Sequence, residues 1–409
     1  FPVPCPRMKI LFISRRLPHA GVTGGHVIVH QRVRRLAARG HEVSLAAFCD
    51  EDDRPHAGEL QPLLREMELV PPPRPQSPPA RLAHFVGAST PSYYFNFRSA
   101  EMMRRVGDMV ERLRPDIAIA EFSAMGQYLY HNPFLPAVRK IISCHYSVAA
   151  SYRKVADLMK YSARGVRSRL SLWRGLGRFE VDMYRSVDRV LVLTAQERYG
   201  LLGQSSRLRI SVIPPGVDTD FFRPDEKVPR EDSILFTGHY EVDANRDAVR
   251  WFVGSTWPRI RKRHPHLKFH IVGPGSTDEF RALARRDPSV VVVGQVDDLR
   301  PYLQRAKVFV CPVRLGSGLR LKVLEAMAAG VPVVTTTLGV EGIPLHPGDT
   351  GFIADRTRMM AEYVDLLLTD EDLRLRMGRQ GRELVAERFA WEHCIDLLED
   401  VMVETLRQR

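Results

Sequence analysis

The sequence predicts an α/β protein with two doubly wound, Rossmann-like domains. Short β-branched runs alternate with stretches of helical periodicity along almost all of the chain, which indicates parallel sheets covered by helices. The length of 409 residues is too great for one ordinary core and suits two. Pro214, Pro215 and Gly216 interrupt both periodicities, and we place the domain boundary there.

Ten segments carry the strand pattern, five in each half of the chain. In the first domain (residues 8–213) they are Lys9–Ser14, Val43–Phe48, Asp116–Ala120, Lys140–Cys144 and Val190–Leu193. In the second domain (residues 214–390) they are Ser233–Phe236, Lys268–Val272, Val290–Val293, Val308–Cys311 and Pro332–Thr335. Residues 391–409 are expected to form a helix that returns to the first domain, and residues 1–7 an N-terminal arm or extension.

The segment that follows the run Val308–Cys311 is the most informative about function. A glycine-spaced turn leads into a helical pattern that ends at Gly330. The opening amides of a helix have no partners inside it, and its macrodipole is positive there, so such a turn favours phosphate. The residues that supply amides or positive charge are Gly316, Ser317, Gly318, Leu319, Arg320 and Lys322.

Glu325 lies one turn further along the expected helix, on the face shared with Lys322. A phosphate would repel this carboxylate, but ribose hydroxyls could donate hydrogen bonds to it. Amides and cations for a diphosphate, with a carboxylate for a sugar, indicate a nucleotide-sugar pocket. The alternative is that Arg320 and Lys322 only cap a surface turn.

The run LKVLEAMAAGVPVV (residues 321–334) resembles the donor-site signature of glycosyltransferase family four. That family comprises retaining enzymes of the GT-B fold, in which two Rossmann-like domains face each other across a cleft. Its motif usually carries two glutamates separated by seven residues. Glu325 matches the second glutamate, which binds the ribose, whereas the first falls on Ser317. The turn is similar to a sub-group with G-x-G-x-R-x-K in that place.

The resemblance extends to other loops of the second domain. The segment SILFTGHYEVDANRD resembles the strand and glycine turn that carry the family's phosphate-binding arginine and lysine. Here His239 and Asn245 stand in those places, after Gly238, so we expect Lys322 to be the main partner of the departing phosphate. The loops that flank the nucleobase in the family correspond to those containing Gly273 and Val296.

The first domain offers candidates after its expected strands. Gly24 and Gly25 resemble the family's glycine loop, which approaches the donor diphosphate. A dinucleotide-binding loop is the alternative, but the G-x-G-x-x-G order is absent. The resemblance places His145 near the donor sugar, although it could also be a packing histidine. Glu121 could contact or deprotonate an acceptor hydroxyl, or could cap a helix.

Composition narrows the class of partner. The net charge of +12 calls for an anionic partner, but no zinc-finger, RNP-type or basic-zipper pattern supports nucleic acid. Residues 151–189 concentrate basic side chains among apolar ones, which suggests contact with an anionic membrane surface or a solvated helix face. Five scattered cysteines without a C-x-x-C spacing favour the cytoplasm, with a peripheral place at the inner membrane face as an option.

The combined interpretation is a retaining glycosyltransferase. We expect it to move a sugar from a UDP- or GDP-linked donor to a hydroxyl of a glycan or lipid-linked acceptor. No cofactor and no metal are expected, because amides and cationic side chains can stabilise the leaving phosphates. The alternatives are a nucleotide-sugar epimerase or hydrolase of the same fold, and a non-catalytic glycan- or membrane-binding relative.

Overall fold

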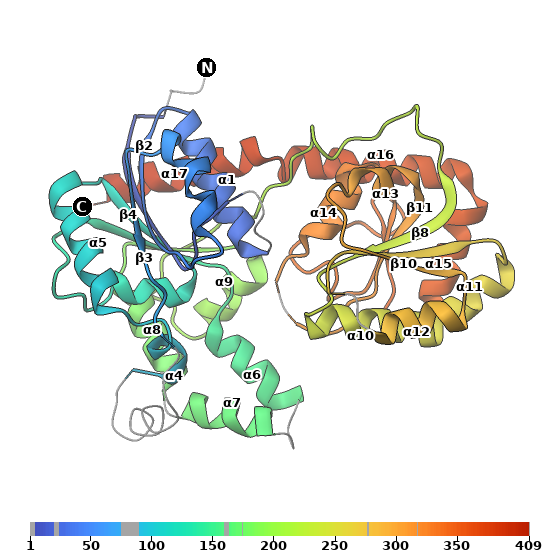
Figure 1. Ribbon diagram of the computed structural model, residues 1–409, viewed down its shortest axis with the longest axis horizontal. Helices are drawn as coiled ribbons and strands as arrows, with labels where there is room; N and C mark the ends of the chain where they lie inside the picture. Colours follow the sequence, from blue (N-terminus) through green and yellow to red (C-terminus); the bar gives the residue numbers. More distant parts are fainter. Residues whose placement is uncertain are drawn as a thin grey trace. The chain divides into compact units, whose positions relative to one another are not determined.

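The computed structural model describes residues 5–19, 24–74, 90–158, 163–173, 175–275, 278–316 and 318–408. The chain forms two compact units, which we call unit 1 (Phe1–Pro214 with Ile395–Arg409) and unit 2 (Pro215–Cys394). Each unit is a parallel β-sheet covered by helices (Figure 1). The α/β, doubly wound architecture expected from the alternating periodicities is therefore confirmed.

Unit 1 contains a seven-stranded sheet in the order β3-β2-β1-β4-β5-β6-β7. Every neighbouring pair is parallel. The strands are β1 (Lys9–Ser14), β2 (Glu42–Phe48), β3 (Glu66–Val70), β4 (Ile117–Glu121), β5 (Arg139–Cys144), β6 (Arg189–Val192) and β7 (Ile210–Val212). The helices are α1 (Gly25–Ala38), α2 (Ala57–Leu60), α4 (Ser92–Phe95), α5 (Ala100–Leu113), α6 (Val148–Leu158), α7 (Ala163–Trp173), α8 (Leu176–Arg185) and α9 (Ala195–Leu202), with 3₁₀ turns η1 (Arg54–His56), η2 (Gln61–Leu63) and η3 (Ser123–Tyr128).

The sheet of unit 1 separates two apolar clusters. Alternate side chains of β1 enter different clusters: Leu11 and Ile13 join one, and Ile10 and Phe12 join the other. Helix α5 packs on the first cluster, and α1 packs on the second. Both faces are buried, which explains why these strands read as nearly continuous apolar runs.

The last helix, α17 (Trp391–Arg407), begins in unit 2 and continues in unit 1 from Ile395 onward. Its apolar side chains, among them Ile395 and Met402, join the cluster beneath α1. Glu399 accepts hydrogen bonds from Arg39 (2.7 Å) and bonds to the ring of His41 (2.8 Å). The chain end is thus tied to unit 1 by apolar burial and by charged contacts.

Unit 2 contains a six-stranded parallel sheet in the order β10-β9-β8-β11-β12-β13. The strands are β8 (Glu231–Thr237), β9 (Lys268–Val272), β10 (Val290–Gly294), β11 (Ala306–Cys311), β12 (Val333–Thr335) and β13 (Phe352–Ile353). The helices are α10 (Asp243–Trp251), α11 (Trp257–Arg263), α12 (Asp278–Arg286), α13 (Arg300–Arg305), α14 (Leu321–Ala328), α15 (Thr357–Thr369) and α16 (Glu371–Arg388), with the π-helical turn η4 (Phe252–Thr256) between α10 and α11.

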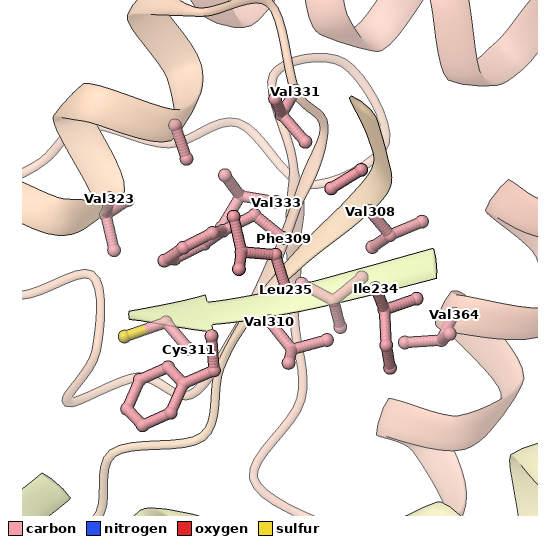
Figure 2. Close-up of a cluster of buried hydrophobic side chains, with 14 of the residues drawn as sticks. Ile234, Leu235, Val308, Phe309, Val310, Cys311, Val323, Val331, Val333 and Val364 are labelled. Carbon is pink, nitrogen blue, oxygen red and sulfur yellow. The ribbon is translucent and has the colours of Figure 1, made fainter. Parts of the chain in front are cut away.

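The central strand β11 organises the core of unit 2. Figure 2 shows Val308, Phe309 and Val310 of this strand beside Ile234 and Leu235 of β8. All five side chains are fully buried. Burial on both faces of the strand requires an apolar residue at every position, and it fixes where the chain leaves the sheet after Cys311.

Three strands were missing from the sequence-based prediction. Strand β3 (EMELV) carries two glutamates and only its last residue is fully buried, so its apolar pattern is weak. Strands β7 and β13 have three and two residues, which is too short for a periodicity. Among the described residues, no helix combines the length and apolar character needed to cross a bilayer.

Helix α5 provides a test of the packing in unit 1. A Cβ atom on Gly107 would lie 2.4 Å from the carbonyl oxygen of Phe134. Gly107→Ala should therefore lower the free energy of unfolding by about 1–3 kcal/mol, as overpacking does. The matched control is Gly200→Ala in α9, where no atom of the described residues lies within 4 Å of the added one. Urea denaturation of both variants checks this, and a Gly107→Ala variant as stable as the control would contradict it.

Candidate active site

Three glycines gather at the carboxyl ends of β8, β9 and β10 in unit 2. The Gly238 amide donates to the Val272 carbonyl (3.0 Å), and the Gly273 amide donates to the Gly294 carbonyl (2.7 Å). A Cβ atom on Gly273 would lie only 2.0 Å from the Gly238 oxygen, so no residue with a side chain fits at this position. Open α/β sheets bind their ligands beyond this edge.

Lys322, in the first turn of α14, reaches the same strand end. Its Nζ donates to the Asn245 side-chain oxygen (2.8 Å) and lies 4.5 Å from the centre of the Phe236 ring. A Cβ on Gly238 would lie 2.8 Å from this Nζ, so the glycine leaves room for the ammonium. The Asn245 amide nitrogen donates to the His239 carbonyl (2.8 Å), which fixes its orientation. Neutral groups therefore hold the cation in place.

The charges of Lys322 and Glu325 are both disfavoured by burial. Burial lowers the pKa of Lys322 to about 8, although the nearby Glu325 carboxylate opposes this shift. Burial raises the pKa of Glu325 to about 7, against the effect of Lys322. An anion arriving beside Lys322 would stabilise its ammonium form, and hydroxyl donors would stabilise ionised Glu325. Lys322 is therefore suited to an anionic ligand group, and Glu325 to a ligand group that donates hydrogen bonds.

The glycine turn before α14 uses left-handed backbone at Gly316 (φ +96°) and Gly318 (φ +87°). Arg320 turns back onto this turn, because its guanidinium lies beside Gly316 and donates to the Leu315 carbonyl (3.2 Å). The Gly318 amide, which was expected to face a phosphate freely, donates instead to the Glu341 carboxylate (3.1 Å). The predicted turn is present, but two of its groups have partners within the protein.

The other described residues of unit 2 that were predicted for donor binding are Leu319, Val296 and His239. Leu319 and Val296 are partly buried and pack against the core of unit 2. One ring nitrogen of His239, Nδ1, is buried and has no hydrogen-bond partner in the part of the chain that the structure describes. Ser317 lies outside the described residues. Unit 2 thus brings Gly238, Asn245, Gly273, Lys322 and Glu325 to one edge of its sheet.

In unit 1, the prediction that Glu121 acts on an acceptor hydroxyl is not supported by its surroundings. Glu121 ends β4 and is 0% exposed. Its carboxylate accepts from Arg32 (3.0 Å) and bonds to Nε2 of His145 (2.7 Å). Burial raises the pKa of Glu121, but the Arg32 charge and the His145 hydrogen bond outweigh it and lower the pKa to about 2. Such a carboxylate is a poor base and positions its neighbours instead.

His145 lies immediately after β5 and is 5% exposed. Burial lowers the pKa of His145, so the neutral ring donates from Nε2 to Glu121 and keeps Nδ1 as an acceptor. This Nδ1 has no hydrogen-bond partner among the described residues and lies against Gly25, where a Cβ would approach to 2.7 Å. Gly24, with φ +63°, opens α1 beside it. The glycines and the histidine predicted in this domain therefore do lie together.

Sequence reasoning missed several residues around His145. Phe122 stacks on the His145 ring at 4.1 Å and has a φ of +72°, which is rare for a bulky side chain and common at functional sites. His26 lies 4.6 Å from Phe122, and burial with the nearby Arg15 charge lowers the pKa of His26 to about 4. Arg32 is buried within α1. No local pattern marks these residues, because their partners are distant in sequence.

Comparison with known families agrees with this architecture. Residues 22–221 match the family model described as Glycosyltransferase Family 4, and residues 231–370 match the model described as Glycosyl transferases group 1. The chain therefore carries, in succession, a match to each of these two glycosyltransferase domain models. The sequence-based resemblance is confirmed at this level, whereas the sub-group with G-x-G-x-R-x-K remains a prediction.

Two curated relatives illustrate the range of similarity. The GDP-mannose-dependent alpha-(1-6)-phosphatidylinositol monomannoside mannosyltransferase of Mycobacterium tuberculosis is 30% identical over 217 residues, which are 47% of this chain and 55% of that protein. The match therefore spans about half the length of that relative. The D-inositol 3-phosphate glycosyltransferase of Corynebacterium aurimucosum is 24% identical over 436 aligned residues, covering 98% of this chain and 96% of that protein.

Solved structures share the fold over nearly the whole chain. Sucrose-phosphate synthase from Thermosynechococcus elongatus gives a TM-score of 0.71 at 19% identity, covering 97% of this chain and 99% of that one. HepE from Anabaena, solved in complex with UDP, gives a TM-score of 0.70 at 13% identity, covering 97% and 100%. The predicted GT-B fold of this chain is thus confirmed.

Two groups of potential metal ligands occur in the described part of unit 1. They are Cys5, His41 and Glu399, and His19, His56 and Glu59. His41 already uses both ring nitrogens, for the Met8 amide and for Glu399. In the second group the two histidine rings stack at 4.1 Å, and His56 bonds to Glu59 (2.8 Å). Both groups are accounted for by these contacts within the protein.

The buried ion pair between Arg32 and Glu121 predicts a pH-dependent stability. Glu121→Gln should lower the free energy of unfolding at neutral pH by about 3–5 kcal/mol, because Arg32 would keep a buried charge without its partner. The pKa of Glu121 is lowered in the folded state, so its contribution is present above about pH 4.5 and is lost as the pH falls toward 2. The variant should lack this acid-dependent loss.

Urea denaturation at neutral and acidic pH measures both effects. The matched control is Glu111→Gln, which changes an exposed glutamate of α5 in the same unit. Equal stability of the Glu121 variant and this control at neutral pH would show that the buried pair does not contribute as described.

Proposed function

We propose that this chain transfers a sugar from a nucleoside-diphosphate sugar to a hydroxyl of a glycan or lipid-linked acceptor. The observation that carries the proposal is the Lys322 ammonium, which neutral groups hold at the end of β8, three positions before the half-buried Glu325. Relatives named for GDP-mannose-dependent and inositol-phosphate glycosyl transfer, and a neighbour of the same fold solved with UDP, support a nucleotide-sugar donor.

Lys322 acts on the leaving group. When the bond between the sugar and the nucleoside diphosphate breaks, negative charge builds up on the phosphate oxygens, and a fixed cation lowers that barrier. Because Lys322 is held before the donor arrives, no reorganisation is needed during the reaction. The charge of Arg320 adds to the same potential. These side chains stabilise the charge on the leaving phosphates, as a divalent ion does in other transferases, so turnover needs no metal.

Glu325 binds the ribose, and the unit 1 residues act on sugar hydroxyls. An ionised Glu325 accepts from the two vicinal hydroxyls of the pentose, which offsets its loss of hydration. In unit 1, Nδ1 of neutral His145 is able to accept a hydrogen bond from a sugar hydroxyl. Glu121, which contacts His145, is enclosed by Arg32 and is not available as a covalent nucleophile. This favours attack from the leaving-group face, with retention of configuration.

The acceptor is carried on a membrane. Helix α7 exposes Val166 (46%), Leu170 (45%) and Trp173 (81%), whose spacing places them on one helical face. Arg167 is exposed beside them, and the surrounding segment is rich in basic residues. Figure 1 shows α7 beyond α6, away from the sheet of unit 1. An apolar stripe flanked by cations fits the surface of an anionic bilayer, and it supports a peripheral place at the inner membrane face.

The donor site predicts different kinetic effects for its two charged residues. Lys322→Ala should lower kcat about 100-fold, the usual effect of losing one group that stabilises a leaving charge. Glu325→Gln should chiefly raise the KM for the donor, by about 10-fold, because it weakens binding before and during the reaction alike. Lys262→Ala, an exposed lysine of α11 in unit 2, is the control.

Release of nucleoside diphosphate from UDP-glucose, UDP-N-acetylglucosamine and GDP-mannose, with an acceptor panel and with EDTA present, measures these effects. Near-wild-type kinetics for both site variants would reject the site. Release without any transfer product would identify a hydrolase or epimerase instead. Absence of binding and turnover with every donor would favour a non-catalytic relative.

The surface of α7 predicts binding to anionic vesicles. Replacing Leu170 and Trp173 together by alanine should lower the partition coefficient at least about 10-fold, because two exposed apolar side chains no longer enter the interface. Co-sedimentation with phosphatidylglycerol vesicles measures this, and phosphatidylcholine vesicles report the part that depends on charge. Leu63→Ala, at an exposed leucine elsewhere in unit 1, is the control. Unchanged partition of the double variant would contradict a role for α7.

A further inference from the structure

A carboxylate from a separate loop lies at the glycine turn of unit 2. Oε2 of Glu341 accepts a hydrogen bond from the Gly318 amide at 3.1 Å. Glu341 is half-buried and follows β12 in the chain. Among the described residues, its second oxygen, Oε1, makes no hydrogen bond. One oxygen therefore fixes the carboxylate and the other remains able to accept from a ligand.

The loop that carries Glu341 is anchored closely to the end of β11. The Thr335 hydroxyl donates to the Cys311 carbonyl (3.2 Å), and the Thr336 hydroxyl donates to the Val313 carbonyl. The Gly339 amide in turn donates to the Thr336 hydroxyl (2.9 Å), and a Cβ on Gly339 would lie 2.8 Å from the Cys311 carbonyl oxygen. The loop thus follows the turn with little freedom.

Apolar contacts also hold the loop that carries Glu341. Val340 and Ile343, on either side of Glu341, are buried in the core of unit 2. Gly342, with φ +85°, provides the left-handed residue that lets the chain turn between them. A carboxylate supported in this way is preorganised, which is what precise recognition of a ligand requires.

The sequence provides the reason why a carboxylate is needed here. Position 317, where the donor motif would place its first glutamate, is a serine. The turn itself therefore supplies no acidic side chain between Leu315 and Lys322. We propose that Glu341 supplies the carboxylate that recognises hydroxyl groups of the donor sugar, from a second loop rather than from the turn. This inference rests on the proposed glycosyl-transfer function.

The diphosphate and the sugar of the donor differ in charge, so they are expected to contact different side chains. The phosphates carry negative charge, so they belong beside the Lys322 ammonium and away from the Glu341 carboxylate. Sugar hydroxyls are donors, and an ionised carboxylate accepts from them strongly. Glu341 therefore contributes to the affinity for the intact nucleotide sugar but not to the affinity for the nucleoside diphosphate alone.

Isothermal titration separates these two affinities. Wild type, Glu341→Ala, Glu341→Gln and the control Glu383→Ala, at an exposed glutamate of α16, are titrated with UDP, UDP-glucose, UDP-N-acetylglucosamine, GDP and GDP-mannose. The quantity compared is the ratio of the dissociation constants of nucleoside diphosphate and matching nucleotide sugar. In Glu341→Ala this ratio should fall about 10–100-fold, with the Kd of the nucleoside diphosphate within about 3-fold of wild type. Glu341→Gln should retain part of the ratio, and the control all of it.

The other outcomes reject the assignment in distinct ways. Equal weakening of both ligands in Glu341→Ala would show that Glu341 only shapes the turn. Tighter binding of the nucleoside diphosphate, with the ratio unchanged, would show that Glu341 occupies the place of a phosphate on the Gly318 amide. A ratio equal to that of wild type, with both affinities unchanged, would show that Glu341 does not contact the donor. If wild type binds none of the five ligands, the proposed function fails rather than the role of Glu341.

Discussion

The proposed chemistry of unit 2 depends on a lysine ammonium that the fold keeps partly dehydrated beside neutral partners. Lys322 contacts the Asn245 amide oxygen and the face of the Phe236 ring, and it has no ion-pair partner in the described part of the chain. Burial of a charge without a counter-ion is unfavourable, and a lowered pKa of Lys322 is the expected sign of this. The glycines at the ends of β8 and β9 provide the space. An anionic ligand would relieve this cost, which is the basis for our proposal that Lys322 binds phosphate.

In unit 1, by contrast, the buried charges are paired with each other. Arg32 and Glu121 neutralise each other in the core, and their contact orients the ring of His145. His145 remains neutral and presents one acceptor nitrogen next to Gly25, the first residue of α1. Both units thus use the carboxyl ends of parallel strands, one for a cation and one for a neutral hydrogen-bonding group.

The fold could be predicted because strands buried on both faces have a strong local pattern. Strand β11 lies where its run of β-branched and aromatic residues indicated, whereas β7 and β13 are too short to show any period. The positions of Lys322 and Glu325 followed from a local motif. The partner of Glu121 could not be predicted, because Arg32 is 89 positions away and lies in a helix rich in other arginines. The contact between Gly318 and Glu341 could not be predicted either, because 23 positions separate the two residues.

A crystal structure of the protein with bound UDP or GDP tests the central claim most directly. We expect phosphate oxygens within hydrogen-bonding distance of the Lys322 Nζ, with the ribose hydroxyls on the Glu325 carboxylate. A nucleotide bound elsewhere on unit 2, with the Lys322 ammonium still held only by Asn245 and the Phe236 ring, would contradict it.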